Sequence, residues 1–226
     1  GRYIGSLTRG VALNGQEQGS ARGTQVQQKV RPDATYLITG GLGGLGLSLA
    51  EWLVGRGARH LALLGRSAPS EKAAQAIARL RAQGADVRTL QADVSQHADM
   101  HRALSEIQQS MPALRGVVHA AMVLDDRTVM QLEDERFRKV MAPKVQGAWN
   151  LHQLTTRLIA HPLDFFVMYS SAAALLGSPG QSHYAAANAF LAALAHHRRS
   201  IGLTALCIDW GLFSDAGIMA ARDQDG

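Results

Sequence analysis

The chain has 226 residues, 46% of them hydrophobic, which fits one large α/β domain with a sizeable core; aromatic residues make up only 5%, so Leu, Ala, Val and Ile must fill that core. The formal net charge of +5 is concentrated at the start, where the first 35 residues hold five basic and two acidic side chains. No Lys/Arg-rich stripe with interleaved aromatics follows, so nucleic-acid binding is not expected.

A cytoplasmic protein without a membrane span is expected. Residues 165–195 lack Asp, Glu, Lys and Arg, but polar and turn residues interrupt them, so no apolar stretch reaches the ~20 residues that a span needs. The N-terminus has no charged-then-apolar signal pattern. The single cysteine, Cys207, is interpreted as a core residue; alone it can form no internal disulfide, which suits a reducing compartment.

The first 34 residues are predicted to lie outside the main fold. Residues 11–34 are rich in Gly, Gln, Ser and Arg without any period, which indicates a linker. The stretch 3–7 has the composition of a strand that belongs to an upstream unit. From residue 35 the pattern changes, and 35–226 is predicted to form the main domain. The chain stops soon after its sixth predicted strand, so both ends are interpreted as cuts in something longer.

Strands and helices alternate from residue 35 onward. The strands are predicted at 36–39, 60–64, 86–91, 115–119, 163–168 and 204–209. The first three helices are marked by apolar residues at helical spacing, namely Leu45, Leu49, Trp52 and Leu53, then Ala73, Ile77 and Leu80, then Met100, Ala103, Leu104 and Ile107. A helical region at 133–159 contains Pro143, which is predicted to bend or split it, and a last helix covers 181–200. This alternation predicts an α/β fold of Rossmann type, a doubly wound parallel sheet with helices on both faces.

A glycine-rich loop joins the first strand to the first helix. It reads Thr39-Gly40-Gly41-Leu42-Gly43-Gly44-Leu45-Gly46. Glycines let the backbone turn tightly and approach a pyrophosphate, and a helix N-terminus offers the anion free N–H groups and the positive end of its dipole. Because this loop follows a strand and opens an amphipathic helix, it predicts dinucleotide binding.

The end of the second strand indicates which dinucleotide is bound. An acidic residue there would hold a free ribose 2′-hydroxyl, but no Asp or Glu is present between residues 60 and 70. Arg66 can instead pair with a 2′-phosphate, and Ser67 can add a hydrogen bond. These residues favour NADP. Asp93, in Ala92-Asp93-Val94 after the third strand, is either an adenine contact or a strand-end cap.

Several motifs together resemble the short-chain dehydrogenase/reductase family. Gly40, Gly44 and Gly46 fit its glycine pattern, and His119-Ala120-Ala121 stands where the family has a motif that lines the cofactor. Ser171 ends the fifth strand, and Tyr184 follows thirteen positions later on a helix. In such an arrangement a phenol can protonate the alkoxide formed by hydride delivery, a serine can orient the ketone, and a nearby ammonium can lower the tyrosine pKa.

The family's usual Tyr-x-x-x-Lys is absent, because Asn188 stands where the lysine would be. This departure resembles one subgroup, the ketoreductase domains of modular type I polyketide synthases and of animal-type fatty acid synthases. There the lysine comes from the preceding long helix, and here that residue is Lys144 in Lys144-Val145-Gln146-Gly147-Ala148-Trp149-Asn150. Asp209-Trp210-Gly211 also fits the subgroup. The resemblance runs from about residue 30 to residue 219.

The resemblance implies NADPH-dependent reduction of a β-ketoacyl thioester, held on an acyl carrier protein, to a β-hydroxyacyl thioester, with Lys144, Ser171, Tyr184 and Asn188 as catalytic residues and no metal. Other domains of the same synthase would be partners. The first 34 residues would be the tail of an upstream structural subdomain and its linker, and the last strand and much of the substrate lid would follow residue 219.

The resemblance also implies a stereochemical type. Leu124-Asp125-Asp126 matches a signature at the path of substrate access, and position 176 is Leu176 rather than the tryptophan of the opposite type. Both indicate a B-type reductase that gives a D-configured hydroxyl. Ala186, two positions after Tyr184, is not the proline linked to epimerised α-methyl substrates, so no epimerisation is expected. The two aspartates could instead form an ordinary solvated acidic loop.

Other functions are less well supported by the sequence. A catalytically inactive structural domain would be expected to lose the tyrosine, the serine or the glycine loop, and all are present. A separate oxidoreductase for a free small alcohol does not fit the exchange of Lys144 and Asn188. A ketoreductase of a fatty-acid-synthase-like multienzyme stays open as an alternative.

Overall fold

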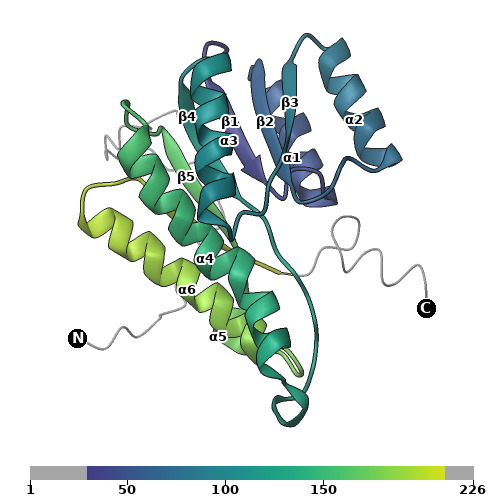
Figure 1. Ribbon diagram of the computed structural model, residues 1–226, viewed down its shortest axis with the longest axis vertical. Coiled ribbons are helices and arrows are strands. Elements are labelled where there is room, and N and C mark those ends of the chain that lie inside the picture. Colours follow the sequence, from purple (N-terminus) through teal and green to yellow (C-terminus); the bar gives the residue numbers. More distant parts are fainter. Residues whose placement is uncertain (1–29, 212–226) are drawn as a thin grey trace, which may run out of the picture.

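A six-stranded parallel sheet organises the computed structural model, which describes residues 30–211 (Figure 1). Its order is β3-β2-β1-β4-β5-β6, and every neighbouring pair is parallel. The strands are β1 Thr35–Thr39, β2 His60–Gly65, β3 Asp86–Gln91, β4 Leu114–His119, β5 Phe165–Ser171 and β6 Leu206–Trp210. The order reverses between β1 and β4, the position at which open α/β sheets bind ligands. The predicted doubly wound fold is confirmed.

Helices cover both faces of this sheet. They are α1 Gly44–Gly55, α2 Glu71–Ala82, α3 His97–Ser110, α4 Asp134–Leu158, α5 Ala173–Leu176 and α6 Ser182–Ser200. Side chains alternate along β1, so that Tyr36 and Ile38 pack with α1 and α2, whereas Leu37 packs with α3, α4 and α6. Figure 1 shows α4 and α6 side by side, and these two helices carry Lys144 and Tyr184.

The packed side of α1 differs from the predicted one. Leu47, Ala50, Leu53 and Val54 are buried, whereas Trp52 is 52% exposed. Because this helix carries apolar residues on all of its sides, their spacing does not indicate which side packs against the sheet. Leu45, Leu49 and Trp52 instead border an apolar groove of about 520 Å³, which Val167 and Tyr169 of β5 and Ile208 and Trp210 of β6 also line.

Pro143 was predicted to bend or split its helix; it does not split it, since α4 runs without a break from Asp134 to Leu158. The proline removes one backbone donor. Val140, Lys144 and Ala148, before and after it, are all buried, so the helix is packed on both sides of the proline. Neither α5 nor the short 3-10 helix η1, Val129–Gln131, was predicted from the sequence.

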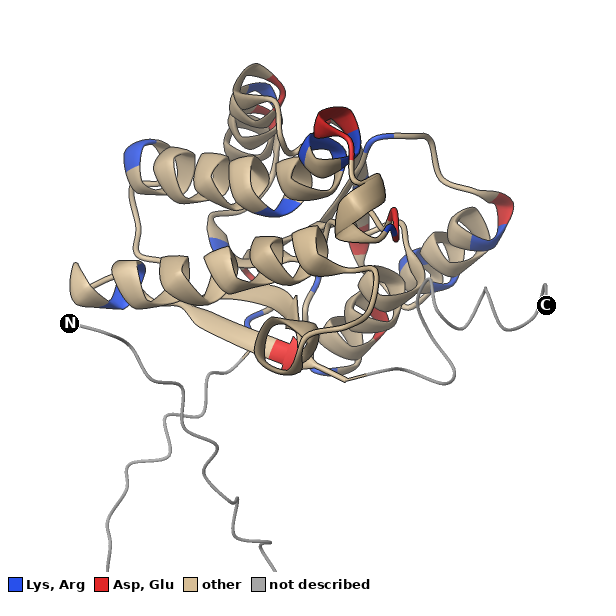
Figure 2. Ribbon diagram, turned by 90° about the horizontal axis from the view of Figure 1, so that it is seen from below, with Lys and Arg blue, Asp and Glu red and all other residues tan. Residues whose placement is uncertain are grey.

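The predicted strand at 3–7 and most of the predicted linker fall outside the described residues. No helix within residues 30–211 is both long enough and apolar enough to cross a bilayer. Figure 2 shows basic and acidic residues interspersed over the helices.

Candidate active site

The glycine-rich loop makes a tight turn between β1 and α1. Gly40 has a φ of +68°, a conformation that favours glycine, and its carbonyl accepts a hydrogen bond from Gly43 N at 3.1 Å. A Cβ on Gly40 would lie 2.8 Å from Ala120 O, and one on Gly41 2.6 Å from Ile38 O. A Cβ on Gly46 would overlap Gly40 O. The backbone is therefore packed too closely for side chains.

The N-terminus of α1 has no side-chain cap, because its N-cap residue is Gly43. Gly43 and Gly44 are exposed. The first N–H groups of a helix lack partners within the helix, and they favour an anion. The residues present here therefore fit a dinucleotide pyrophosphate.

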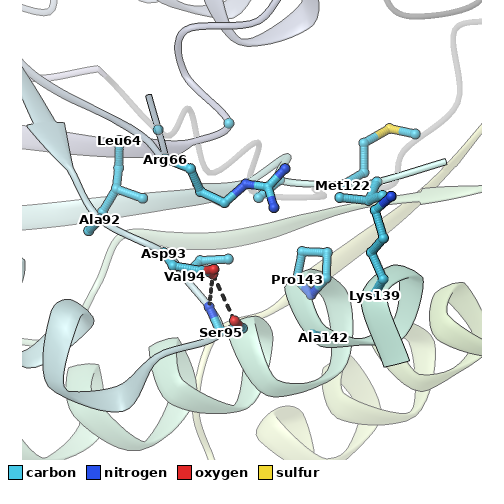
Figure 3. A pocket seen from close by; sticks show the side chains of 14 residues that line it. Leu64, Arg66, Ala92, Asp93, Val94, Ser95, Met122, Lys139, Ala142 and Pro143 are labelled. Carbon is cyan, nitrogen blue, oxygen red and sulfur yellow. Dashed lines mark hydrogen bonds between the residues drawn. The ribbon is translucent and has the colours of Figure 1, made fainter. Parts of the chain in front are cut away.

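A pocket of about 230 Å³ lies beside this turn, where the sheet order reverses (Figure 3). Figure 3 shows Arg66 reaching from the end of β2 across the pocket, opposite Met122 and Lys139. The lining residues are Gly40, Leu64, Gly65, Arg66, Ala92, Asp93, Val94, Ser95, Ala121, Met122, Val123, Lys139, Ala142 and Pro143. Two cationic side chains thus border the pocket.

Asp93 caps the turn after its strand, one of the two roles that the sequence left open, and it also borders the pocket. Its carboxylate accepts hydrogen bonds from Ser95 N at 2.9 Å and from Ser95 Oγ at 2.7 Å, which caps the turn after β3. The same residue lines the pocket (Figure 3). Asp99 in turn accepts from Asp93 N at 2.9 Å. The turn is therefore held rigidly at the pocket's edge.

Some predicted cofactor residues lie away from the pocket. Leu45 borders the apolar groove instead, since its side chain leaves α1 on the other side. Leu42 packs against Gly65, and Ser67 is exposed and does not line the pocket. Ala120 approaches Gly40 through its backbone. Of the predicted set, Gly40, Arg66, Asp93, Val94 and Ala121 line the pocket.

Sequence reasoning missed Met122, Lys139 and Pro143. Lys139 and Pro143 are four positions apart on α4 and so share one side of it, whereas they stand five positions and one position before Lys144. The spacing from Lys144 therefore gave no signal for either residue. Met122 directly follows the predicted His119-Ala120-Ala121 motif.

His119 is buried at the end of β4, next to the loop and to Lys144. Its Nδ1 lies 2.7 Å from Oγ1 of Thr39, which is also buried. Burial, aided by the positive charge of Lys144, lowers the pKa of His119 to about 3. The ring is thus neutral at physiological pH and links the ends of β1 and β4.

The four predicted catalytic residues gather where α4, α6 and β5 meet. Lys144 Nζ lies 5.5 Å from the centroid of the Tyr184 ring and donates a hydrogen bond to Tyr169 O at 2.7 Å. Asn188 Nδ2 donates to Tyr184 O, one turn earlier on α6, at 2.8 Å. Ser171 stands at the end of β5.

The electrostatics of Tyr184 and Lys144 differ from the simple expectation. Burial raises the pKa of Tyr184 above its usual 10, and hydrogen bonding by Asn188 and Ser171 offsets part of the rise. Burial lowers the pKa of Lys144 to about 8. The predicted lowering of the tyrosine pKa is not seen, because burial of the hydroxyl, which disfavours the phenolate, outweighs the interactions that favour it.

The Tyr184 hydroxyl and the Asn188 side-chain oxygen have different surroundings. Tyr184 Oη lies 4.0 Å from Sδ of Met122, which lines the pocket, so the hydroxyl stands one residue away from the pocket. Asn188 Oδ1 is buried and has no hydrogen-bond partner among residues 30–211. Such an oxygen can accept a hydrogen bond from a donor that enters the site.

The two aspartates of the Leu-Asp-Asp loop, residues 124–126, do not form an ordinary solvated pair. The Asp125 side chain is only 11% exposed, and its carboxylate lies 2.7 Å from Arg136 Nη1 and 3.6 Å from Lys139 Nζ. Gln181 Nε2 donates to Asp126 Oδ1 at 3.1 Å. Leu176, the other predicted marker, is exposed on α5.

A family model described as KR domain matches residues 34–215. The chain is 42% identical over 217 residues to a subunit of the phenolphthiocerol/phthiocerol polyketide synthase of Mycobacterium tuberculosis, a match that covers 96% of the chain and 10% of that relative. It is 43% identical over 201 residues to the highly reducing polyketide synthase Preu1 of Preussia isomera, a match that covers 87% of the chain and 8% of that relative. The chain therefore spans about a tenth of the length of the curated relatives it matches.

Solved structures give the same result. A ketoreductase domain from the bacillaene assembly line superposes with a TM-score of 0.80 at 35% identity, covering 86% of this chain and 48% of that one. A structure of A-type ketoreductases from a modular polyketide synthase gives 0.79 at 36% identity, with coverages of 92% and 44%. With a family model over most of its length and relatives above 40% identity, the chain belongs to the ketoreductase (KR) domain family of polyketide synthases.

Proposed function

We propose that the chain reduces the ketone of a β-ketoacyl thioester, carried on an acyl carrier protein, to a β-hydroxyacyl thioester with NADPH. One observation carries this proposal. Lys144, Ser171, Tyr184 and Asn188 come from three different elements, yet they gather in one place, where the Tyr184 hydroxyl reaches Met122, a residue that lines the pocket beside the glycine-rich turn.

The pocket fits a nicotinamide dinucleotide, which supplies the hydride when it is bound. The glycine backbone and the uncapped N-terminus of α1 suit its pyrophosphate. Arg66 and Lys139 border the pocket, whereas the one acidic residue that lines it, Asp93, is engaged by Ser95. The Arg66 guanidinium suits the additional 2′-phosphate of NADPH better than the free hydroxyl of NADH, whereas Lys139 also pairs with Asp125.

The protonation step is assigned to Tyr184. Its raised pKa keeps the hydroxyl protonated at neutral pH, so Oη can give its proton to the alkoxide oxygen as the ketone is reduced. The Lys144 ammonium near the ring then stabilises the phenolate. Ser171 Oγ is proposed to hold the carbonyl oxygen, and Asn188 fixes the turn of α6 that carries the tyrosine.

The surroundings of the domain are part of the proposal. The curated relatives are polyketide synthases about ten times longer than this chain, which supports an acyl carrier protein and other domains of the same synthase as partners. Residues 35–226 are proposed to be the catalytic ketoreductase domain and residues 1–34 the end of an upstream structural subdomain with its linker.

The stereochemical proposal is B-type reduction to a D-configured hydroxyl without α-epimerisation. It rests on Leu124-Asp125-Asp126, Leu176 and Ala186 rather than on the fold, since A-type ketoreductases are among the similar structures. The two ion pairs of the largely buried Asp125 support a defined role for the loop rather than a solvated one.

The test is Tyr184→Phe in the full-length protein, assayed with NADPH and a racemic 2-methyl-3-ketoacyl thioester. Removing only the hydroxyl should leave NADPH binding intact and lower turnover by about 10²–10⁴-fold. Chiral chromatography of the parent's product should give the D-configured alcohol. Near-normal turnover by the phenylalanine variant would refute the assignment of the acid, and a mainly L-configured product would refute the B type. An inactive parent that still binds NADPH would favour a structural domain.

A further inference from the structure

The Leu-Asp-Asp loop is tied to the segment directly before Tyr184. His183 Nε2 lies 2.9 Å from Asp125 O, and Gln181 Nε2 donates to Asp126 Oδ1 at 3.1 Å. Arg127 N donates to Gly180 O at 2.8 Å. Contacts therefore join three successive residues of the loop region to residues 180–183, which form the turn before α6 and its first two residues.

His183 is the most deeply placed member of this set. It is 1% exposed and immediately precedes Tyr184. A carbonyl oxygen only accepts, so Nε2 carries the hydrogen and donates to Asp125 O. The other ring nitrogen, Nδ1, is buried and has no hydrogen-bond partner within the described part of the chain. A site that needed only bulk would hold an apolar residue, so the Nε2 bond is the feature that accounts for an imidazole here.

The same loop is held from the opposite side by α4. Arg136 and Lys139 bind the Asp125 carboxylate at 2.7 Å and 3.6 Å. Asp125 is thus fixed through its side chain to the helix of Lys144 and through its carbonyl to the helix of Tyr184. A shift of the loop would therefore break contacts to the helix that carries Tyr184, the proposed proton donor.

We propose that His183 is a positioning residue that locks the Leu-Asp-Asp loop against the tyrosine helix and so determines which face of the ketone is presented to Tyr184. This inference rests on the proposed reductase function. Since His183 is not among the residues that line the cofactor pocket, it acts through the loop rather than by touching the cofactor.

Two variants separate the hydrogen bond from the volume of the side chain. His183→Gln keeps an N–H donor at a similar reach, whereas His183→Leu removes the donor. With the 3-ketoacyl thioester, His183→Leu should raise KM about 2- to 10-fold, the effect of one lost hydrogen bond, while kcat changes less. It should also increase the fraction of the minor hydroxyl epimer. His183→Gln should restore both values toward the parent, and exposed His161→Leu should change neither.

A second readout does not depend on activity. Arg127 is exposed at the end of the loop, so tryptic cleavage after it reports how firmly the loop is held. His183→Leu should speed this cleavage and the hydrogen exchange of the Arg127 amide, and His183→Gln should not. Unchanged loop protection and an unchanged epimer ratio in a folded His183→Leu protein would overturn the inference. Faster cleavage in a protein whose parent reduces no thioester would instead count against the proposed function while leaving the loop contact established.

Discussion

Lys144 illustrates how one buried side chain gains its properties from its surroundings. Only 2% of it is exposed, and its ammonium has the Tyr169 carbonyl as hydrogen-bond acceptor. Burial disfavours the charged form and lowers the lysine pKa to about 8 from 10.5. The residue is therefore charged at neutral pH but close to losing its proton.

We expect this pKa to limit activity on the alkaline side. If the ammonium stabilises the Tyr184 phenolate, kcat/KM should fall as the pH rises through about 8, well before Tyr184 itself titrates. Lys144→Arg keeps its charge far above this pH, so any activity that it retains should lack the decline. The measurement is kcat/KM across the neutral to alkaline range. An identical decline in parent and arginine variant would assign it to another group.

Cofactor choice is testable at Arg66. Arg66→Ala should weaken NADPH binding by roughly 10- to 150-fold, the range for a charge-assisted hydrogen bond, and leave NADH binding nearly unchanged. Arg79→Ala is the matched control, because Arg79 is an exposed arginine on α2 that pairs with Glu51. Dissociation constants from fluorescence titration decide the matter. Equal losses for NADPH and NADH would contradict a 2′-phosphate contact.

At the level of single residues, the sequence predicted those whose place is fixed by their position next to a strand or a helix. The glycine turn, Arg66, Ser171 and Tyr184 could be located because each follows a strand or opens a helix at a fixed offset. Lys139 and Met122 could not, because they reach the pocket only through the way α4 and the β4 loop pack. The direction of the tyrosine pKa also depends on burial, which spacing does not encode.

Among the secondary-structure elements, the turn into α1 is the most constrained. A Cβ on Gly46 would overlap Gly40 O and lie 2.6 Å from Gly41 Cα, both backbone atoms that cannot move independently. The first turn of α1 therefore sits directly on the glycine loop, and the loop's shape depends on glycine within the helix.

Gly46→Ala should accordingly disrupt the loop. We expect a loss of stability of about 1–3 kcal/mol, as for overpacked sites, and at least tenfold weaker NADPH binding. Gly55→Ala, at the other end of α1, is the control: nothing lies within 4 Å of its Cβ position, so it should raise stability by about 0.5–1 kcal/mol and leave binding unchanged. Urea denaturation and NADPH titration test both. A stable, binding Gly46→Ala protein would show that the loop tolerates a methyl group.

Element positions were predictable where a periodic pattern met a turn signal. All six strands and the five long helices could be located. The buried side of α1 could not, because that helix carries apolar residues on all of its sides, and its second apolar side borders the groove beside β5 and β6. That Pro143 leaves α4 unsplit was not predictable for a related reason: residues before and after the proline are buried, and spacing alone does not show this packing.

At the scale of the whole molecule, the fully buried titratable side chains include lysine, arginine and histidine, and among the described residues none of them is Asp or Glu. Arg198 is 2% exposed; it lies 3.8 Å over the Phe166 ring, and its Nη1 lies 3.1 Å from His152 Nδ1. Burial and the charge of Arg198 lower the pKa of His152 to about 4. Protonating His152 would place a second cation beside a buried guanidinium between α4 and α6.

This arrangement should make the fold acid-sensitive. The unfolded chain protonates a histidine near pH 6.5 and the folded chain holds His152 neutral to about pH 4, so the unfolded state binds more protons between these values and the free energy of unfolding falls as the pH is lowered. The contribution of His152 amounts to about 2 kcal/mol between about pH 7.5 and about pH 5. His119, held neutral to about pH 3, adds a loss of the same sign.

The variant that isolates this effect is His152→Asn, because its amide oxygen can still accept from Arg198 but cannot titrate. We expect the drop in unfolding free energy between about pH 7.5 and about pH 5, measured by urea denaturation, to be about 2 kcal/mol smaller than in the parent. Replacing exposed His101 by Asn should leave the drop unchanged. Equal drops in the parent and in His152→Asn would mean that the helix pair α4 and α6 accommodates the protonated ring, and that the acid sensitivity of the domain arises elsewhere.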